Sequence, residues 1–184
     1  MIGDKLVITE YHRENGRKVA AAVIERMKGI DRAFAVTVAG ESGSGKSETA
    51  ATTGDELEKQ GLKVVILGQD DYFKLPPKSN AARRVEGIDW VGSSEVRLDL
   101  MDEHFRSAKE GKSEVTKPLV YFEEDRIGEE TISIEGVDII IAEGTYTTML
   151  EEADLHAFID TTGQAVTFAG LGYVEVFFFF SPDT

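Results

Sequence analysis

Cysteine is absent from this chain of 184 residues, and its absence removes several kinds of chemistry at once. Without thiols there is no disulfide, no thiolate zinc site and no cysteine nucleophile. No apolar run reaches the roughly 18 residues that a membrane span needs, and residues 1–18 contain no apolar signal segment. We therefore expect one cytoplasmic domain covering residues 1–184, with no membrane association.

Positive charge is also scarce. The chain has 20 Lys and Arg against 34 Asp and Glu, so its formal net charge is −14. Such a chain opposes binding to nucleic acid and to anionic membranes, which leaves a small molecule as the expected partner. The deficit is concentrated at one end, since residues 127–184 contain no Lys or Arg. If this protein binds a polyphosphate, it needs local cations and a divalent metal.

One short stretch, "GESGSGKS" at residues 40–47, fits the spacing G-x-x-x-x-G-K-[ST]. An apolar strand pattern precedes it and a helical pattern follows it. Glycines let the backbone amides turn inward around a phosphate, and the start of a helix adds partial positive charge. Lys46 would reach the β- and γ-phosphates, and the Ser47 hydroxyl would bind Mg²⁺. The stretch therefore predicts a site for a nucleoside triphosphate, with ATP and Mg²⁺ as cofactors.

Apolar runs alternate with helical patterns along most of the chain, which is typical of an α/β fold with a mostly parallel sheet. We expect a P-loop NTPase fold whose sheet is flanked by helices, with a small β-hairpin insertion near 118–136. The pattern predicts strands at 33–39, 63–69, 137–144 and 155–160, helices at 16–29, 47–60, 93–112 and 147–154, and a long polar connection at 75–92.

Carboxylates follow two of the predicted strands. Asp70 and Asp71 come after the strand at 63–69, and Glu143 lies at the end of the strand at 137–144. The carboxyl ends of strands are where open α/β sheets bind ligands. A carboxylate there can deprotonate an acceptor hydroxyl or hold Mg²⁺ through water. We favour Asp70 for the first role, and Asp71 stays open as the alternative.

The motifs "GESGSGKS", "GQDDYF", "IDWVG", "KPLVYFEEDRI" and "IIIAEGTY" resemble, in order and spacing, the uridine kinase/phosphoribulokinase-like P-loop kinases over residues 33–160. The resemblance implies a kinase that transfers the γ-phosphate of ATP to a hydroxyl of a nucleoside or sugar-like molecule. It implies that Asp70 is the base, that Glu143 joins Ser47 near Mg²⁺, that Asp89 holds sugar hydroxyls, and that Tyr121 through Arg126 line the acceptor pocket.

Two departures concern the acceptor. Uridine kinases usually carry Asp-His-Pro where this chain has Asp89-Trp90-Val91, and a histidine within the stretch 122–126, which lacks one here. These departures argue against uridine itself. Arg83, Arg84 and Arg126 could receive an anionic acceptor, or could instead pair with nearby Glu86 or Glu124.

The expected site has three groups of residues. ATP binding is assigned to the loop and the start of its helix, metal binding to oxygen ligands, and substrate binding to the acceptor side, with Lys46 and Asp70 as the catalytic pair. The ATP group is Glu41, Ser42, Gly43, Ser44, Gly45, Lys46, Ser47 and Glu48; the metal group is Ser47, Asp70 and Glu143; the substrate group is Asp71, Phe73, Arg83, Asp89, Tyr121 and Arg126.

The C-terminal part, residues 161–184, departs from the family that it resembles. Such kinases carry an arginine-bearing helical lid after the strand that matches 155–160, and no Lys or Arg is present here. Its β-branched and aromatic residues predict a strand at 172–180, and "FFFF" at 177–180 predicts a buried strand or an association surface of a homo-oligomer. We expect the lid to be missing and kinase activity to be weak.

Two other functions stay open. The chain could be a nucleotide-binding regulatory or degenerate protein with little transfer, or an ATPase that uses water as the acceptor. A GTPase is disfavoured, because the sequence has no Asn-Lys-x-Asp guanine motif.

Overall fold

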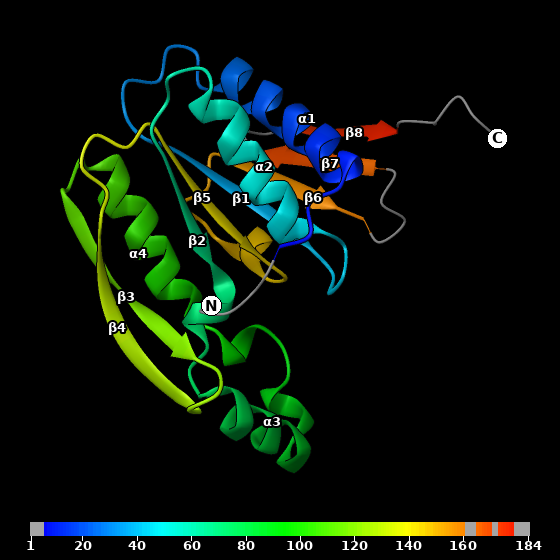
Figure 1. Ribbon diagram of the computed structural model, residues 1–184, viewed down its shortest axis with the longest axis vertical. Helices are drawn as coiled ribbons and strands as arrows, with labels where there is room; N and C mark the ends of the chain where they lie inside the picture. The colour runs from blue at the N-terminus through cyan, green and yellow to red at the C-terminus, as the bar shows by residue number, and fades with distance from the viewer. Residues whose placement is uncertain (1–5, 161–164, 171–172, 179–184) are drawn as a thin grey trace.

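A six-stranded sheet with the order β2-β5-β1-β6-β7-β8 forms the centre of the protein (Figure 1). The computed structural model describes residues 6–160, 165–170 and 173–178. β2, β5, β1 and β6 run parallel, whereas β7 and β8 continue the sheet antiparallel. The strands are β1 (Phe34–Gly40), β2 (Val64–Gly68), β5 (Ile139–Gly144), β6 (Leu155–Ile159), β7 (Ala165–Gly170) and β8 (Tyr173–Phe178). All four strands expected from the alternating pattern up to residue 160 are confirmed.

Helices cover both faces of the sheet. On one face α1 (Glu10–Arg26) packs against α2 (Lys46–Glu58), and on the other face lies α4 (Leu98–Lys109). Side chains of β5 alternate between the two faces. Ile139 and Ile141 pack into the core beneath α1 and α2, and Ile140 packs into the core beneath α4. The expected α/β architecture, a parallel sheet flanked by helices, is confirmed. None of the described helices combines the length and the apolar character needed to cross a bilayer.

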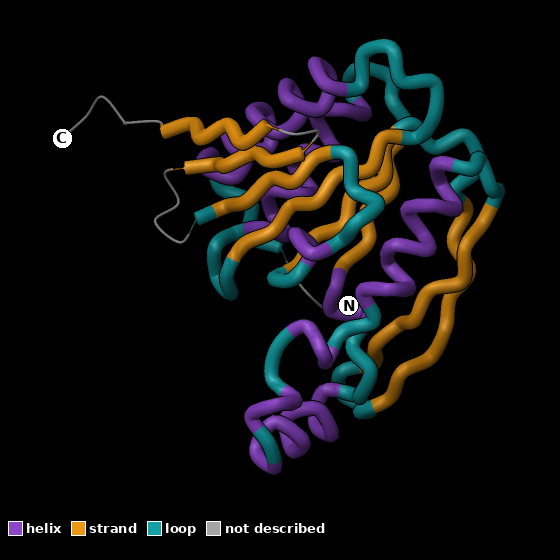
Figure 2. Tube along the Cα trace, turned by 180° about the vertical axis from the view of Figure 1, so that it is seen from behind, coloured by secondary structure: helices purple, strands orange, loops and turns teal. Residues whose placement is uncertain are grey.

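A separate hairpin of β3 (Glu114–Tyr121) and β4 (Arg126–Ser133) packs beside α4 (Figure 2). This confirms the hairpin near 118–136, although its first strand begins at Glu114. The hairpin carries one wall of the candidate site described below.

Two expectations about helices are wrong. The segment 75–92 is not a plain connection, because it contains α3 (Pro77–Glu86) and the short 3-10 turn η2 (Ile88–Trp90). Pro77 occupies the first turn, where a missing N–H costs nothing and the fixed φ suits a helix. The helix expected at 147–154 shrinks to the single turn η4 (Thr147–Met149). The first helix starts at Glu10, six residues before the range predicted for it.

The C-terminal segment adds two strands to the sheet. β8 confirms the strand expected at 172–180 over residues 173–178, and β7 was not predicted. Both extend the sheet beyond β6, as Figure 1 shows. Residues 179 and 180 of the aromatic run lie outside the described residues.

Asp154 joins the start of β1 to the segment before β6. Its buried carboxylate accepts two hydrogen bonds from Arg32 at 2.9 Å each and one from the Ala35 amide at 2.9 Å. Burial alone would raise the pKa of Asp154, but the Arg32 and Ala35 donors outweigh it and hold the pKa below its usual value. The charged form is therefore the one that stabilises the fold.

We predict that Asp154→Asn lowers the free energy of unfolding by roughly 1 to 2 kcal/mol at neutral pH, because it removes the charged partner of Arg32, whose side chain is itself 37% exposed to water. The contribution is present above the ordinary aspartate pKa of about 3.9 and is lost as the pH falls through the lowered folded-state pKa. Urea melts of both proteins from pH 7 to pH 3 would measure this. Equal stability of the two proteins at pH 7 would contradict it.

Candidate active site

The phosphate loop connects the end of β1 to the start of α2. Gly43 and Gly45 both adopt φ of +80°, a region that side chains disfavour. A Cβ on Gly45 would also lie 2.6 Å from His12 Nε2, so the first turn of α1 leaves room only for glycine. α2 then begins at Lys46, where the first amides of a helix have no acceptor within the helix. The loop thus presents bare amides where a phosphate would bind.

The residues assigned to ATP lie together on this loop. Glu41, Ser42 and Gly43 are exposed, Gly45 through Glu48 are partly buried, and Ser44 is buried. The Ser44 amide donates to the Glu41 carbonyl at 3.1 Å, which closes the turn. A ligand could therefore reach the outer part of the loop while its inner part is held in place.

Glu143 lies at the end of β5 and faces the loop. It follows Ile139 and Ile141 on the same side of the strand, and this side packs against α2. The Ser47 hydroxyl donates to Glu143 Oε2 at 3.0 Å. Gly68 on β2 makes the space, since a Cβ there would lie 3.2 Å from Glu143 Oε1. Strand alternation and sheet order together bring this carboxylate to the phosphate loop.

The surroundings of Glu143 disfavour its negative charge, and a bound cation would stabilise that charge. Burial raises the pKa of Glu143, the Ser47 hydroxyl opposes the rise, and the Asp70 charge adds to it. A divalent cation would favour the charged carboxylate. Ser47, Glu143 and Asp70 offer hard oxygen ligands, which suit Mg²⁺ bound through one or two carboxylates and substrate phosphates. Within the described part of the chain no cluster of three His, Cys, Asp or Glu forms a metal site by protein ligands alone.

The two aspartates after β2 have different environments. They lie in the 3-10 turn η1 (Gln69–Tyr72), where Asp70 is exposed and Asp71 is buried. Asp71 Oδ2 accepts from Lys117 Nζ at 2.8 Å, and its Oδ1 accepts from the Val120 amide at 3.1 Å. Asp71 thus ties η1 to the hairpin, and Asp70 is exposed on the side where a ligand could reach it.

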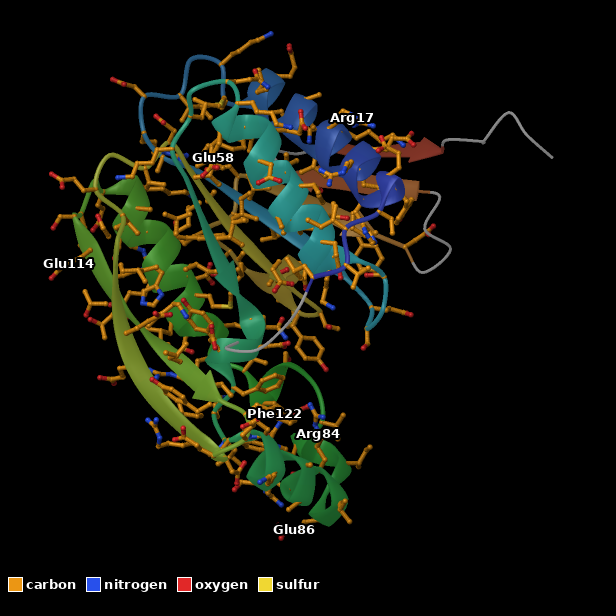
Figure 3. The ribbon with its side chains drawn as sticks, viewed as in Figure 1. Arg17, Glu58, Arg84, Glu86, Glu114 and Phe122 are labelled. Carbon is orange, nitrogen blue, oxygen red and sulfur yellow. The ribbon has the colours of Figure 1, made fainter. Side chains whose placement is uncertain are left out.

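Asp70 opens into a cavity of about 230 Å³ between η1, α3 and the tip of the hairpin. Figure 3 shows Arg84 of α3 and Phe122 of the hairpin close to each other at this junction. Most of the lining is apolar, and the polar groups are Asp70, Asn80 and Arg84. The lining residues are Asp70, Phe73, Leu75, Pro77, Asn80, Arg84, Val120 and Phe122.

Arg84 is held in the cavity wall by a buried carboxylate. Glu95 is fully buried, and its Oε2 accepts from Arg84 Nε and from Asn80 Nδ2, both at 2.6 Å. The Gly92 amide donates to the other oxygen at 2.8 Å. Burial alone would raise the pKa of Glu95, but these donors lower it below its usual value. Glu95 is therefore charged and offsets the charge of Arg84.

Five of the six residues assigned to substrate binding are not among the cavity-lining residues. One is Asp71, described above, whose substrate role stays a prediction, and the other four lie as follows. Arg83 pairs with Glu86 at 3.3 Å, and Arg126 pairs with Glu124 at 3.1 Å. Arg126 also stacks on Tyr121 at 3.8 Å. Asp89 is exposed in the turn η2. The structure thus places Phe73 in the cavity with Asp70, and the roles assigned to Arg83, Asp89, Tyr121 and Arg126 stay predictions.

Sequence reasoning missed the part of the cavity that α3 contributes. Pro77 at the head of a run of good helix formers was the available signal. Asn80 carried no signal of its own, because it reaches the cavity only through the packing of α3 beside the hairpin. Phe122 lies within the stretch 121–126 that the resemblance placed in the pocket wall.

A glycine-rich turn between a buried parallel strand and a helix, with a carboxylate facing it from the adjacent strand, is the arrangement of P-loop nucleotide-binding proteins. The model of the phosphoribulokinase/uridine kinase family matches residues 35–168. The chain therefore belongs to this family.

Individual relatives agree with this assignment. A uridine kinase of Yersinia enterocolitica is 30% identical over 132 residues, which are 68% of this chain and 61% of that protein. A uridine kinase of Yersinia pestis matches to the same extent. The match thus spans 61% of the length of these curated relatives.

Two solved structures share the fold. A possible uridine kinase from Bacillus stearothermophilus has a TM-score of 0.60 and 18% identity, and the match covers 79% of each chain. A D-glycerate 3-kinase from Cryptococcus neoformans has a TM-score of 0.54 and 19% identity over 70% of this chain and 51% of that one. At this identity the similarity shows the fold alone.

We predict that Lys46→Ala weakens Mg·ATP binding by roughly 10- to 100-fold, the value of a charged hydrogen bond lost from a phosphate. Calorimetric titration with ATP measures it. Lys59→Ala, at the other end of α2 and paired with Glu56, is the matched control and should bind ATP as the unaltered chain does. Equal binding by the Lys46 variant would contradict the assignment of the loop.

Proposed function

We propose that this protein is an ATP-dependent small-molecule kinase that transfers the γ-phosphate of Mg·ATP to a hydroxyl group. One observation supports this most strongly: Asp70 lines the apolar cavity and lies two residues after Gly68, which stands beside Glu143 in the sheet, and Glu143 is bonded to Ser47 of the phosphate loop. A carboxylate between a phosphate site and an acceptor cavity is suited to orient a hydroxyl and take its proton.

In the proposed reaction the loop amides and Lys46 would hold the phosphates, and Ser47 and Glu143 would hold the metal. Mg²⁺, when bound, would neutralise charge that develops on the phosphoryl oxygens. Asp70 accepts the proton of the acceptor hydroxyl as its oxygen attacks the γ-phosphorus. The apolar wall of Phe73, Val120 and Phe122 keeps water away from the attacking position.

The charge balance of the cavity favours a neutral acceptor, such as a nucleoside or a sugar, over a phosphorylated one. Each arginine considered for an anionic acceptor is paired with a glutamate: Arg83 with Glu86, Arg84 with Glu95, and Arg126 with Glu124. Asp70 adds a further negative charge to the wall. The relatives named above as uridine kinases make uridine one compound to test.

The arrangement also supports slow transfer. Residues 127–184 contain no Lys or Arg, so no cation from this part of the chain can stabilise the transferring phosphoryl group. This observation favours a second candidate function, that of a nucleotide-binding protein with little phosphoryl transfer. The turnover measured below distinguishes this candidate from an active kinase.

Asp70→Asn keeps the size of the side chain but removes the proton acceptor. We predict that it lowers the rate of phosphoryl transfer by about 10²-fold while ATP binding stays unchanged. The rate is measured as steady-state ADP formation in the presence of an alcohol that the unaltered protein phosphorylates. Asp99→Asn, on the exposed first turn of α4, serves as the control, and undiminished transfer by the Asp70 variant would exclude Asp70 as the base.

We further predict that neutral alcohols are better acceptors than phosphorylated sugars. An anionic group beside Asp70 meets its repulsion, and Arg84, the cation among the cavity-lining residues, is already paired with Glu95. This lowers kcat/KM by at least about tenfold. A panel of nucleosides, free sugars and sugar phosphates, assayed at one ionic strength, measures this. A sugar phosphate turned over faster than every neutral compound would contradict the charge argument.

A further inference from the structure

Lys117 on β3 is a charged residue in an unusual position. It is only 6% exposed, although lysine is almost never buried unless it is paired. Its Nζ donates to Asp71 Oδ2 at 2.8 Å and lies 2.7 Å from Glu130 Oε1 on the neighbouring strand β4. It also donates to the Pro118 carbonyl at 3.2 Å. Neither the phosphate loop nor the cavity lining includes this lysine.

The partner of Lys117 is also bonded to the wall of the acceptor cavity. Asp71 accepts from the Val120 amide at 3.1 Å, and Val120 lines the cavity together with Asp70. Asp71 is the direct neighbour of Asp70 in η1. One buried carboxylate therefore connects the candidate base to the wall against which an acceptor would rest.

Two other residues of η1, Gln69 and Tyr72, fix the turn through hydrogen bonds to other parts of the protein. Gln69 Oε1 accepts from the Tyr146 amide at 2.7 Å, and the Tyr72 hydroxyl lies 2.8 Å from His104 Nδ1. Gln69, Asp71 and Tyr72 are buried, and Asp70 is the exposed residue of the turn. Among these contacts, those of Asp71 reach the hairpin, through Lys117 Nζ and the Val120 amide. These two contacts together set the distance between η1 and the hairpin wall, and the Lys117 contact is the one that a side-chain substitution can remove.

We propose that Lys117 is a positioning residue for phosphoryl transfer. Through its ion pair with Asp71 it holds Asp70 at a fixed distance from the Val120 wall, so that the base meets the hydroxyl of a bound acceptor. The inference rests on the proposed kinase function. Because the residue acts through Asp71 on the geometry of Asp70, its loss should affect the chemical step and leave the ATP site intact.

Two variants test the inference. Lys117→Met keeps the length of the side chain and removes the charge. Asp71→Asn keeps the size of its side chain and leaves Lys117 paired with Glu130. We expect it to have the same effect on kcat, so it tests the inference even if the lysine variant does not fold. The matched control is Lys109→Met at the C-terminal end of α4, because Lys109 is also largely buried between carboxylates, at 3.6 Å from Glu152 and 3.4 Å from Asp154.

We expect both test variants to lower kcat by about 10²-fold, the effect of a misplaced catalytic group, with a much smaller change in the acceptor KM. ATP binding measured by calorimetry should match that of the unaltered chain. Lys109→Met should keep kcat even where it lowers the melting temperature. Full kcat in the folded test variants, or an equal loss of kcat in Lys109→Met, would overturn the inference.

Hydrogen exchange of the Val120 amide gives a readout that does not need turnover. Exchange should be faster in Lys117→Met than in the unaltered chain and unchanged in Lys109→Met. Unchanged exchange at Val120 in Lys117→Met would overturn the inference even if the protein is an active kinase. Conversely, an unaltered chain that binds ATP and transfers phosphate to no acceptor would show that the proposed function itself fails.

Discussion

The parallel pairing of β5 with both β1 and β2 is the constraint on which the rest of the site depends. In this register Glu143 stands beside Val38 of β1 and Gly68 of β2. The carboxyl ends of the three strands therefore meet at one edge, so the loop after β1, the turn after β2 and the end of β5 become neighbours. A slip of one residue would move Glu143 to the opposite face, away from Ser47, and no change in the loop could restore the contact.

Buried carboxylates in this acidic chain are matched in two different ways. Asp71, Glu95 and Asp154 each accept from a lysine or an arginine, and these pairs hold elements together. The hydrogen bond of Glu143 comes instead from the neutral hydroxyl of Ser47, and burial raises its pKa. Asp71, Glu95 and Asp154 therefore stabilise the fold, whereas Glu143 can still bind a cation that arrives with a ligand.

The sequence was sufficient for those parts of the site that local patterns determine. The glycine spacing of the phosphate loop and the strand before Glu143 depend on neighbours in the chain, and both were predicted in place. The part of the cavity that α3 contributes was missed, because Asn80 reaches the same cavity as Asp70 and Phe122 only when α3 packs beside the hairpin tip. Lys117 was missed for a related reason. Its burial against Asp71 follows from a contact between residues 46 positions apart, which no periodicity reports.

The most direct test of the account is to follow Mg·ATP by phosphorus NMR in the presence of a neutral alcohol that the protein binds. The account predicts that the γ-phosphate signal is replaced by that of a phosphomonoester as ADP appears, because Asp70 delivers an alcohol oxygen rather than water to the phosphorus. Formation of inorganic phosphate alone, at the same rate with and without the alcohol, would contradict it.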